Sequence, residues 1–250
     1  MRIDCVSGDI RAVKADMVVV NLFEGMKRPG GAAAAIDAAI GGAITAAVRD
    51  GDFEGKLGET LSLRPSRGLS SPRVLVVGLG KKEKFIADHA RQAMLPVLKA
   101  AKRMRLSTVT SIVHGSGAGG VDPGTAARFC ALGASLSAFD FDRYKEKREH
   151  RVARFLFVER DARAFPAARD GVRRGERLGE AINWGRALVA SPRPSCAPTT
   201  SPARQGGWPA ASGPRRRARC GSGSSASPSL PPSRPEGSSP SRREAPPRRA

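Results

Sequence analysis

Apolar residues follow two alternating rhythms along residues 1–190. Short runs rich in β-branched residues are typical of strands, and longer stretches with an apolar residue at every third or fourth position are typical of helices. Their alternation indicates an α/β domain built in layers. The runs that predict strands are 16–21, 59–64, 73–77, 108–113 and 151–158.

Two of these runs differ in the burial they predict. The run 16–21, with sequence DMVVVN, is apolar without alternation, so we expect a strand that is covered on both faces. In contrast, the run 59–64, with sequence ETLSLR, alternates between polar and apolar residues. Such alternation predicts a half-buried strand.

Four helices are predicted around these strands. An alanine-rich helix over 32–40 is bounded by glycine pairs, and a helix over 84–104 contains Pro96, which we expect to kink or split it. Asp122 and Pro123 predict an N-cap followed by a first-turn proline. The last predicted helix spans 165–189. The apolar face expected for the helix after Pro123 consists of Thr125, Phe129, Leu132, Leu136 and Phe139.

The composition changes sharply near Ser191. Residues 201–250 contain 11 Ser, 10 Pro, 10 Arg, 7 Ala and 6 Gly, and they contain no Ile, Val, Phe, Tyr, Met, Lys, Asn or Asp. A segment of this composition cannot bury enough apolar surface to offset the entropy of its chain. We therefore predict two regions, a folded domain over 1–190 and a disordered Ser/Pro/Arg-rich tail over 191–250.

The net charge of +20 is shared unevenly, with +8 carried by residues 201–250 and +12 by the rest. Such a balance is compatible with weak nucleic-acid binding through the basic surface or the tail. It is also typical of a solvated basic face encoded by a GC-rich gene, and that interpretation is favoured because no nucleic-acid-binding motif accompanies the charge.

The four cysteines, Cys5, Cys130, Cys196 and Cys220, are scattered without a C-x-x-C pair, which argues against a disulfide framework and a structural zinc site. Cys5 and Cys130 are expected to be core thiols. The N-terminus lacks the apolar segment of a signal peptide, and the longest strongly apolar run is too short to cross a bilayer. We therefore expect a cytoplasmic protein without membrane association.

The sharpest motif is the glycine-rich segment 115–120, which satisfies G-x-G-x-x-G, with Asp140 about twenty residues further on. In dinucleotide-binding folds the third glycine lies inside the helix and the helix N-terminus meets a pyrophosphate. Here Asp122 and Pro123 place the start of the helix after the glycines, and the cap adds a carboxylate. A connecting turn is therefore favoured over a cofactor site.

The remaining candidates indicate no catalytic constellation. Gly78 and Gly80, followed by two lysines, end a strand without the spacing of a P-loop. Asp140 and Asp142 are expected in a solvated connection between a helix and a strand. The three histidines are isolated in sequence, with His89 expected on a helix surface and His114 at a strand end; the third is His150. No residue is therefore assigned a catalytic, cofactor-binding or metal-binding role.

Taken in order, the landmarks of residues 1–200 resemble the N-terminal domain of the leucyl (cytosol) aminopeptidase family, peptidase family M17. The resemblance is carried by the strand DMVVVN, the helix with Ile36-Asp37 and Gly41-Gly42, and the segment DFEGKLGE at 52–59. It continues with RVLVVGLGKKEKF at 73–85 and EAINWGRALV at 180–189. The family's "NxP" linker has an imperfect counterpart in residues 190–192.

The resemblance implies a macro-like mixed sheet flanked by helices. It also implies a larger C-terminal catalytic domain in the intact family, where two divalent metals, zinc or manganese, activate water to release N-terminal residues from peptides. The motifs that resemble GKGITFDSGG and NTDAEGRL in that domain are absent from this sequence. The chain is thus expected to be truncated before the catalytic domain, to hold no cofactor and to be inactive alone. The family's homo-hexamer, built largely through that domain, is not expected to form.

Out-of-frame translation of a GC-rich gene yields Arg, Pro, Ala, Gly and Ser, the composition found after about residues 196–204. We therefore hypothesise that a frameshift replaced the catalytic domain, and sequencing the DNA for residues 185–210 in all frames tests this. The alternative function is a macro-like module that binds nucleic acid or an ADP-ribose-type ligand. The sequence alone leaves undecided whether this chain is an enzyme.

Overall fold

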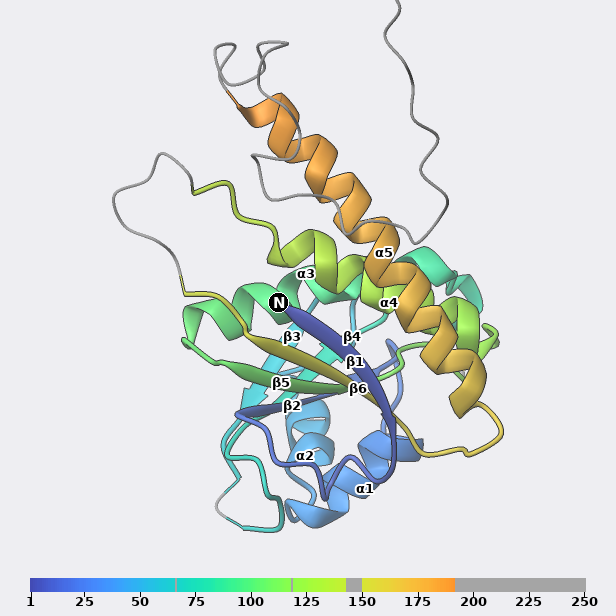
Figure 1. Ribbon diagram of the computed structural model, residues 1–250. Coiled ribbons are helices and arrows are strands. Elements are labelled where there is room, and N and C mark those ends of the chain that lie inside the picture. The colour runs from blue at the N-terminus through green and yellow to red at the C-terminus, as the bar shows by residue number, and fades with distance from the viewer. Residues whose placement is uncertain (66, 118, 143–149, 192–250) are drawn as a thin grey trace, which may run out of the picture. The chain divides into compact units, whose positions relative to one another are not determined.

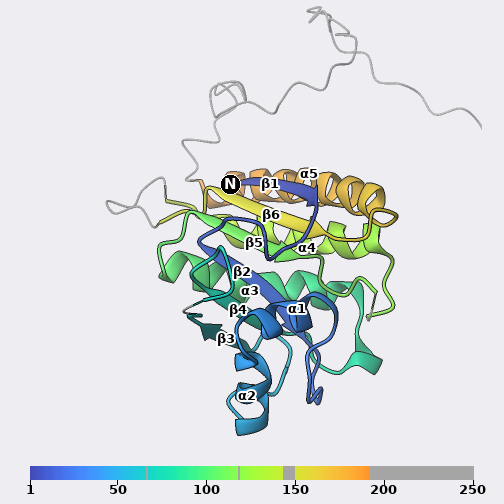
Figure 2. The ribbon, with the colours of Figure 1, turned by 90° about the horizontal axis from the view of Figure 1, so that it is seen from below.

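A single six-stranded sheet organises the part of the chain that the computed structural model describes, residues 1–65, 67–117, 119–142 and 150–191. The strand order is β1-β6-β5-β2-β4-β3, as Figure 2 shows. All neighbouring strands are parallel except β3, which runs antiparallel to β4. The predicted mixed sheet is therefore confirmed. The strands are β1 (Arg2–Ser7), β2 (Met17–Leu22), β3 (Thr60–Leu63), β4 (Val74–Gly78), β5 (Thr108–Ile112) and β6 (Arg154–Glu159).

Helices cover both faces of the sheet. Two short helices lie on one face and three longer helices lie on the other (Figure 1). This arrangement confirms the layered α/β domain that the alternating pattern predicts. The short helices are α1 (Gly31–Ala39) and α2 (Ala43–Asp50), and the long ones are α3 (Ala87–Arg103), α4 (Pro123–Ala138) and α5 (Phe165–Ala190), with a 3₁₀ turn, η1 (Lys82–Lys84), before α3.

The central strand β2 is buried on both faces, as its unbroken apolar run predicts. Met17 and Val19 belong to the cluster under α3, α4 and α5, whereas Val18 and Val20 belong to the cluster under α1 and α2. All four side chains are at most 1% exposed. Because side chains alternate across a strand, four successive buried apolar residues are expected only where helices cover both faces of the sheet.

Two elements, β1 and α2, were not predicted from the sequence. The N-terminus of α2 is stabilised from outside the helix, by Asp37 on α1. The Asp37 carboxylate accepts hydrogen bonds from the backbone N–H groups of Ile44 (2.7 Å) and Thr45 (3.2 Å) and from the Thr45 hydroxyl. The cap residue itself, Gly42, supplies no side chain and adopts a φ of 80°. A capping residue supplied by the preceding helix gives no local start signal.

Pro96 does not split its helix, since α3 runs continuously from Ala87 to Arg103. Proline removes one backbone hydrogen bond within a helix and crowds the preceding turn. Burial on both sides of Pro96 holds the helix together, since Ala93, Met94, Val97 and Leu98 are all fully buried.

The apolar face predicted for α4 is wrong in part: Leu132 is buried as expected, but other members of the predicted face are not. Thr125 is exposed, and Phe129 and Leu136 are only half-buried. The buried face consists mainly of small residues, because α4 is packed between α3, α5 and the sheet, and close helix contacts favour small side chains. The predicted Asp122 cap is confirmed, since its Oδ2 accepts the Thr125 N–H at 2.9 Å. The small buried residues of α4 are Ala126, Ala127, Cys130, Ala131, Gly133, Ala134 and Ser135.

The helix predicted over 165–189 corresponds to α5, which ends at Ala190. From residue 192 onward the predicted tail, together with Cys196 and Cys220, lies outside the described residues. Within the described part, none of the individual helices has the length and apolar character needed to cross a membrane. The bent pair formed by α1 and α2, with an angle of 103° between them, meets that criterion by length and composition only.

Candidate functional site

The carboxyl ends of β1, β2, β5 and β6 converge at one edge of the sheet. β2 and β5 are neighbours, but the chain leaves β2 for α1 on one face and β5 for α4 on the other. Open α/β sheets bind ligands at such a topological switch point. A cavity of about 230 Å³ lies at this edge, between the ends of β5 and β6, the segments that follow β1, β5 and β6, and the start of α1. We call it the carboxyl-edge cavity.

The start of α1 gives this cavity hydrogen-bond donors. The N-cap residue Gly30 has no side chain to cap the helix, and the first turn contains no acidic residue. Gly31 and Ala32, at the beginning of the helix, line the cavity. The first N–H groups of a helix have no partner within the helix and attract anions.

Charged side chains of both signs complete the lining: Asp9 after β1, and Glu159 and Arg160 at the end of β6. Hydrogen bonds from Arg11 lower the pKa of Asp9 to about 2, so it is a carboxylate at neutral pH. Glu159 accepts the N–H of Asp161 at 3.0 Å. Carboxylates accept hydrogen bonds from hydroxyls, and an arginine with a helix N-terminus binds an anion, so the arrangement suits binding of a polar ligand.

The glycine-rich segment 115–120 is a connecting turn that precedes α4, as the sequence favours. Among the described residues of this segment, only Ser116 lines the carboxyl-edge cavity. Gly115 has a φ of 85°, and a Cβ there would overlap the ring of Phe85. A Cβ on Gly119 would overlap the Gly115 backbone and lie 3.0 Å from the Phe85 ring. These glycines therefore permit close packing against Phe85.

Asp140 and Asp142 are not in a solvated connection, which corrects the prediction. Asp140 forms an ion pair with Lys102 at 2.8 Å, and these two side chains are only 16% and 17% exposed. Asp142, 15% exposed, pairs with Arg151 at 2.7 Å. Both carboxylates are held by basic partners outside the cavity and take no part in ligand binding there.

The turn that contains Gly78 and Gly80 ends β4, as predicted. The Gly78 N–H donates to the Glu59 carbonyl at 2.8 Å, and the Gly80 N–H donates to the Gly55 carbonyl at 2.9 Å. The segment that pairs with this turn is held by the Glu59 carboxylate, which accepts hydrogen bonds from the backbone N–H groups of residues 54–56. Because these amides already have partners, the turn offers no anion site.

The three histidines lie in separate environments. His114 follows β5 and is fully buried, which lowers its pKa to about 3, and its Nε2 lies 3.1 Å from Ser111 Oγ. His89 is half-buried with its ring against Phe85, so its expected surface position is wrong in part. His150 Nε2 contacts the Leu106 carbonyl at 3.0 Å.

The two thiols in the described residues are both unreactive. Cys130 is fully buried, and burial raises its pKa to about 12, which confirms a core thiol. Cys5 is only half-buried, packed against the core, and burial raises its pKa to about 11. Since the thiolate is the reactive form, neither group serves as a nucleophile near neutral pH.

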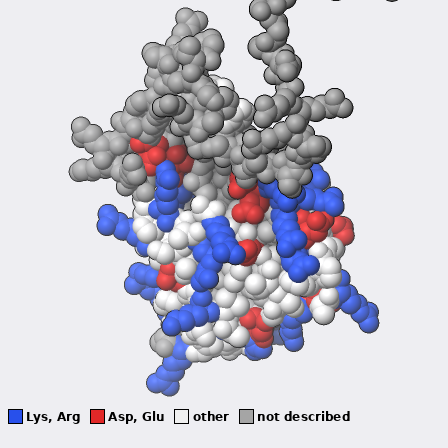
Figure 3. Space-filling model, viewed as in Figure 1, with Lys and Arg blue, Asp and Glu red and all other residues white. Residues whose placement is uncertain are grey.

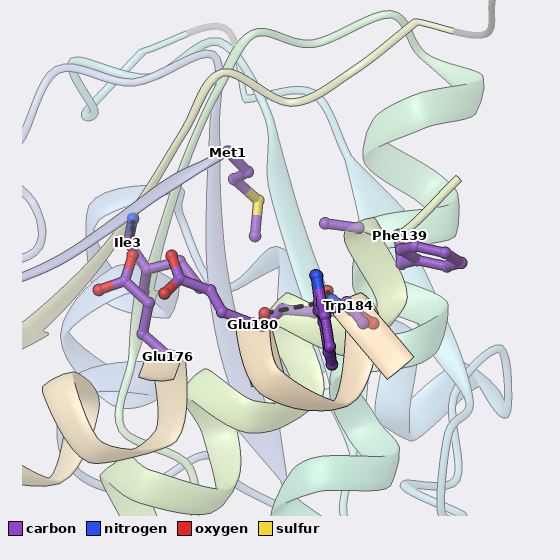
Figure 4. A pocket seen from close by; sticks show the side chains of 9 residues that line it. Met1, Ile3, Phe139, Glu176, Glu180 and Trp184 are labelled. Atoms are coloured by element: carbon purple, nitrogen blue, oxygen red, sulfur yellow. Dashed lines mark hydrogen bonds between the residues drawn. The ribbon is translucent and has the colours of Figure 1, made fainter. Parts of the chain in front are cut away.

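A second cavity, of about 360 Å³, lies between β1, the end of α4 and α5 (Figure 4). Glu176 and Glu180 project into it from α5, with Trp184 one turn further along. Burial and the nearby Glu180 raise the pKa of Glu176, which also accepts the Ile3 N–H at 3.2 Å. The pair was not singled out from the sequence, because it becomes recognisable only when β1 is placed beside α5.

Among the described residues, no group of three or more His, Cys, Asp and Glu side chains could hold a metal ion. The side chains present in this part therefore do not fit a two-metal centre, and we assign no chemical step to a metal there.

Basic and acidic side chains are interspersed over the face shown in Figure 3.

The family model "Cytosol aminopeptidase family, N-terminal domain" matches residues 19–148, just over half of the chain. The chain belongs to the cytosol aminopeptidase family. A probable cytosol aminopeptidase from Acidobacterium capsulatum is 32% identical over 164 residues, which cover 65% of this chain and 32% of that protein. The chain spans only about a fifth to two fifths of the length of the curated relatives it matches.

Solved structures confirm the macro-like fold. A mutant of tomato leucine aminopeptidase superposes with a TM-score of 0.61 at 19% identity, covering 76% of this chain and 38% of that one. The Oceanobacillus iheyensis macrodomain with ADP gives a TM-score of 0.55 at 19% identity, covering 71% and 92%. At such identities the likeness shows the fold alone.

Proposed function

We propose that residues 1–190 form the non-catalytic N-terminal domain of a metal-dependent leucyl aminopeptidase, and that this chain has no peptidase activity alone. The match of the N-terminal family model to residues 19–148 carries the proposal. It is supported by the sequence, in which no segment resembles the catalytic-domain motifs. In this proposal, the domain contributes structure or ligand binding while a separate domain supplies the two metals and the water they activate.

Manganese binding tests the proposal. We expect calorimetric titration of the full chain with Mn²⁺ to give no saturable heat, because the motifs that the resemblance assigns to the two-metal centre do not occur in this sequence. The positive control is a metal-dependent aminopeptidase from which the metals have been removed, titrated with Mn²⁺ in the same way. Saturable uptake of two ions per chain would refute the proposal.

A second function is favoured by the carboxyl-edge cavity: binding of an ADP-ribose-type ligand. The uncapped N-terminus of α1 and Arg160 can receive a phosphate, and Asp9 can accept hydrogen bonds from ribose hydroxyls. A macrodomain of the same fold has been solved with ADP. At about 230 Å³ the cavity is smaller than the roughly 300–1,000 Å³ of typical ligand sites, so it would enclose only part of such a ligand.

Calorimetry with ADP-ribose tests this second function. We expect saturable binding that is abolished by Ala35→Leu, since Ala35 lines the cavity and the larger side chain fills it. The matched control is Ala38→Leu, at an exposed position of the same helix outside the cavity. Absence of binding by the unaltered chain, or equal loss in the two variants, would show that the cavity is not the ligand site.

The other expectations from the sequence remain proposals. Nucleic-acid binding through the tail concerns residues outside those the structure describes. A cytoplasmic location is supported by the relatives, which are named cytosol aminopeptidases. We further propose that the hexamer of the family does not form from this chain, because the resemblance places most of its contacts in the catalytic domain.

A further inference from the structure

A groove of about 540 Å³ runs along α3, separate from the two cavities described above. Its opposite side is formed by α4 and the end of α5, and one end is bordered by the loop before β3. α3 and α4 are in close contact at its base, where a Cβ on Gly133 would overlap the Arg91 carbonyl group. The groove is therefore a shallow channel with a rigid floor.

Apolar side chains in this groove are unusually accessible. Leu95 on α3 is 60% exposed, and Leu57 in the loop is 37% exposed. Pro96 and Leu136 extend the apolar lining. A single exposed leucine needs no explanation, but several apolar side chains along one channel are typical of a surface that binds another molecule.

The charged side chains that line the groove are all basic. Arg91 is bridged to Asp88, with Nε–Oδ1 and Nη2–Oδ2 distances of 2.5 and 3.0 Å. Lys99 has no ion-pair partner within the described part of the chain. Arg186 donates to the Leu136 carbonyl and to Asn183 Oδ1, both at 3.1 Å, and lies 4.5 Å over the Phe139 ring. These contacts orient its charge without neutralising it.

The order of these groups along α3 suggests the shape of an occupant. Arg91, Leu95 and Lys99 are four residues apart, so they lie in a line along one side of the helix. Pro96 has no N–H, so the Gln92 carbonyl lacks its helical donor and can accept a hydrogen bond. An apolar side chain flanked by carboxylates would match this line in both polarity and charge.

We propose that this groove docks an acidic amphipathic helix of a partner protein, with leucine-like side chains against Leu95 and carboxylates toward Lys99 and Arg186. Insertion of an apolar helix face into a groove is a general mode of peptide recognition. Nothing in this proposal depends on peptidase function or on a ligand in the carboxyl-edge cavity. The charge of the groove disfavours a basic occupant.

Fluorescence anisotropy with the full chain tests the proposal. The probe is a fluorescein-labelled helical peptide of about 14 residues, or four turns, with Leu on one face and Glu on both flanks. A second probe carries Gln in place of every Glu. Measurements at about 0.15 M salt limit the general attraction of a chain with a net charge of +20 for any acidic peptide.

We expect Leu95→Ser to weaken binding of the acidic probe about tenfold, because burial of a leucine stabilises a complex by that factor or more. The matched control is Ile86→Ser, which alters a 58% exposed residue outside the groove and should change the dissociation constant by less than about twofold. Lys99→Glu should weaken binding in the same way, whereas Lys82→Glu, an equal charge reversal on η1, should not.

Three results would overturn the proposal. Equal effects of the groove variants and their controls would show that net charge alone attracts the probe. Equal affinity for the Glu and Gln probes would show that the basic side chains of the groove do not contribute to binding. Dimerisation of the unaltered chain in sedimentation experiments, abolished by Leu95→Ser but not by Ile86→Ser, would identify a second copy as the occupant instead.

Discussion

Replacing Gly175 with alanine should destabilise the domain by about 3 kcal/mol, although alanine is the better helix former. Gly175 lies where α5 crosses α4, and a Cβ on it would be closer than 3.0 Å to the Arg128 carbonyl oxygen. That oxygen belongs to the backbone of α4 and cannot rotate away, so the two helices would have to separate. Urea unfolding followed by circular dichroism measures the change.

Gly185→Ala provides a matched control in the same helix, since no atom lies within 4 Å of a Cβ at this position. The helix propensity of alanine should then stabilise the domain by up to about 1 kcal/mol. The two identical substitutions are thus expected to have opposite signs. If Gly175→Ala were as stable as the unaltered chain, the close packing of α4 against α5 would be wrong.

The residues that create this contact form a regular pattern in the sequence. Gly171, Gly175 and Gly179 are four residues apart, which places them on one side of α5. A Cβ on any of them would overlap an atom of α4. Glycines are not part of an apolar stripe because they have no side chain, and the small residues that form most of the buried face of α4 escape prediction for a similar reason.

The buried strand β2 was predicted from the sequence, because burial on both of its faces leaves no polar residue among Met17–Val20. The Asp122 cap was equally predictable, since a cap and its helix are adjacent in sequence. α2 was missed because its capping carboxylate, Asp37, lies in the preceding helix. Features set by neighbouring residues could therefore be predicted from the sequence, whereas those set by contacts between different helices or strands could not.

The same limit applies to the candidate sites. Asp9, Gly31 and Arg160 meet in the carboxyl-edge cavity, yet they follow three different strands and form no motif. In contrast, the visible G-x-G-x-x-G motif proved to be a turn that packs against Phe85. A parallel sheet brings together loops that are far apart in sequence, so only the strand order reveals this cavity.

The central claim, that this chain has the fold of an aminopeptidase domain without the catalytic centre, leads to the largest expected effect: complete absence of turnover. In the proposed scheme, aminopeptidase activity depends on a two-metal centre, and the motifs of that centre do not occur in this sequence. Cooperative urea unfolding of the same preparation would show that an inactive sample is folded.

The most direct measurement is release of p-nitroaniline from leucyl-p-nitroanilide by the purified full chain in Mn²⁺ or Zn²⁺, compared with the same sample in EDTA. A known leucine aminopeptidase, assayed in parallel, verifies the substrate and metals. We predict identical, background rates for the chain with and without EDTA. Metal-dependent turnover that EDTA abolishes and added Mn²⁺ restores would contradict the account.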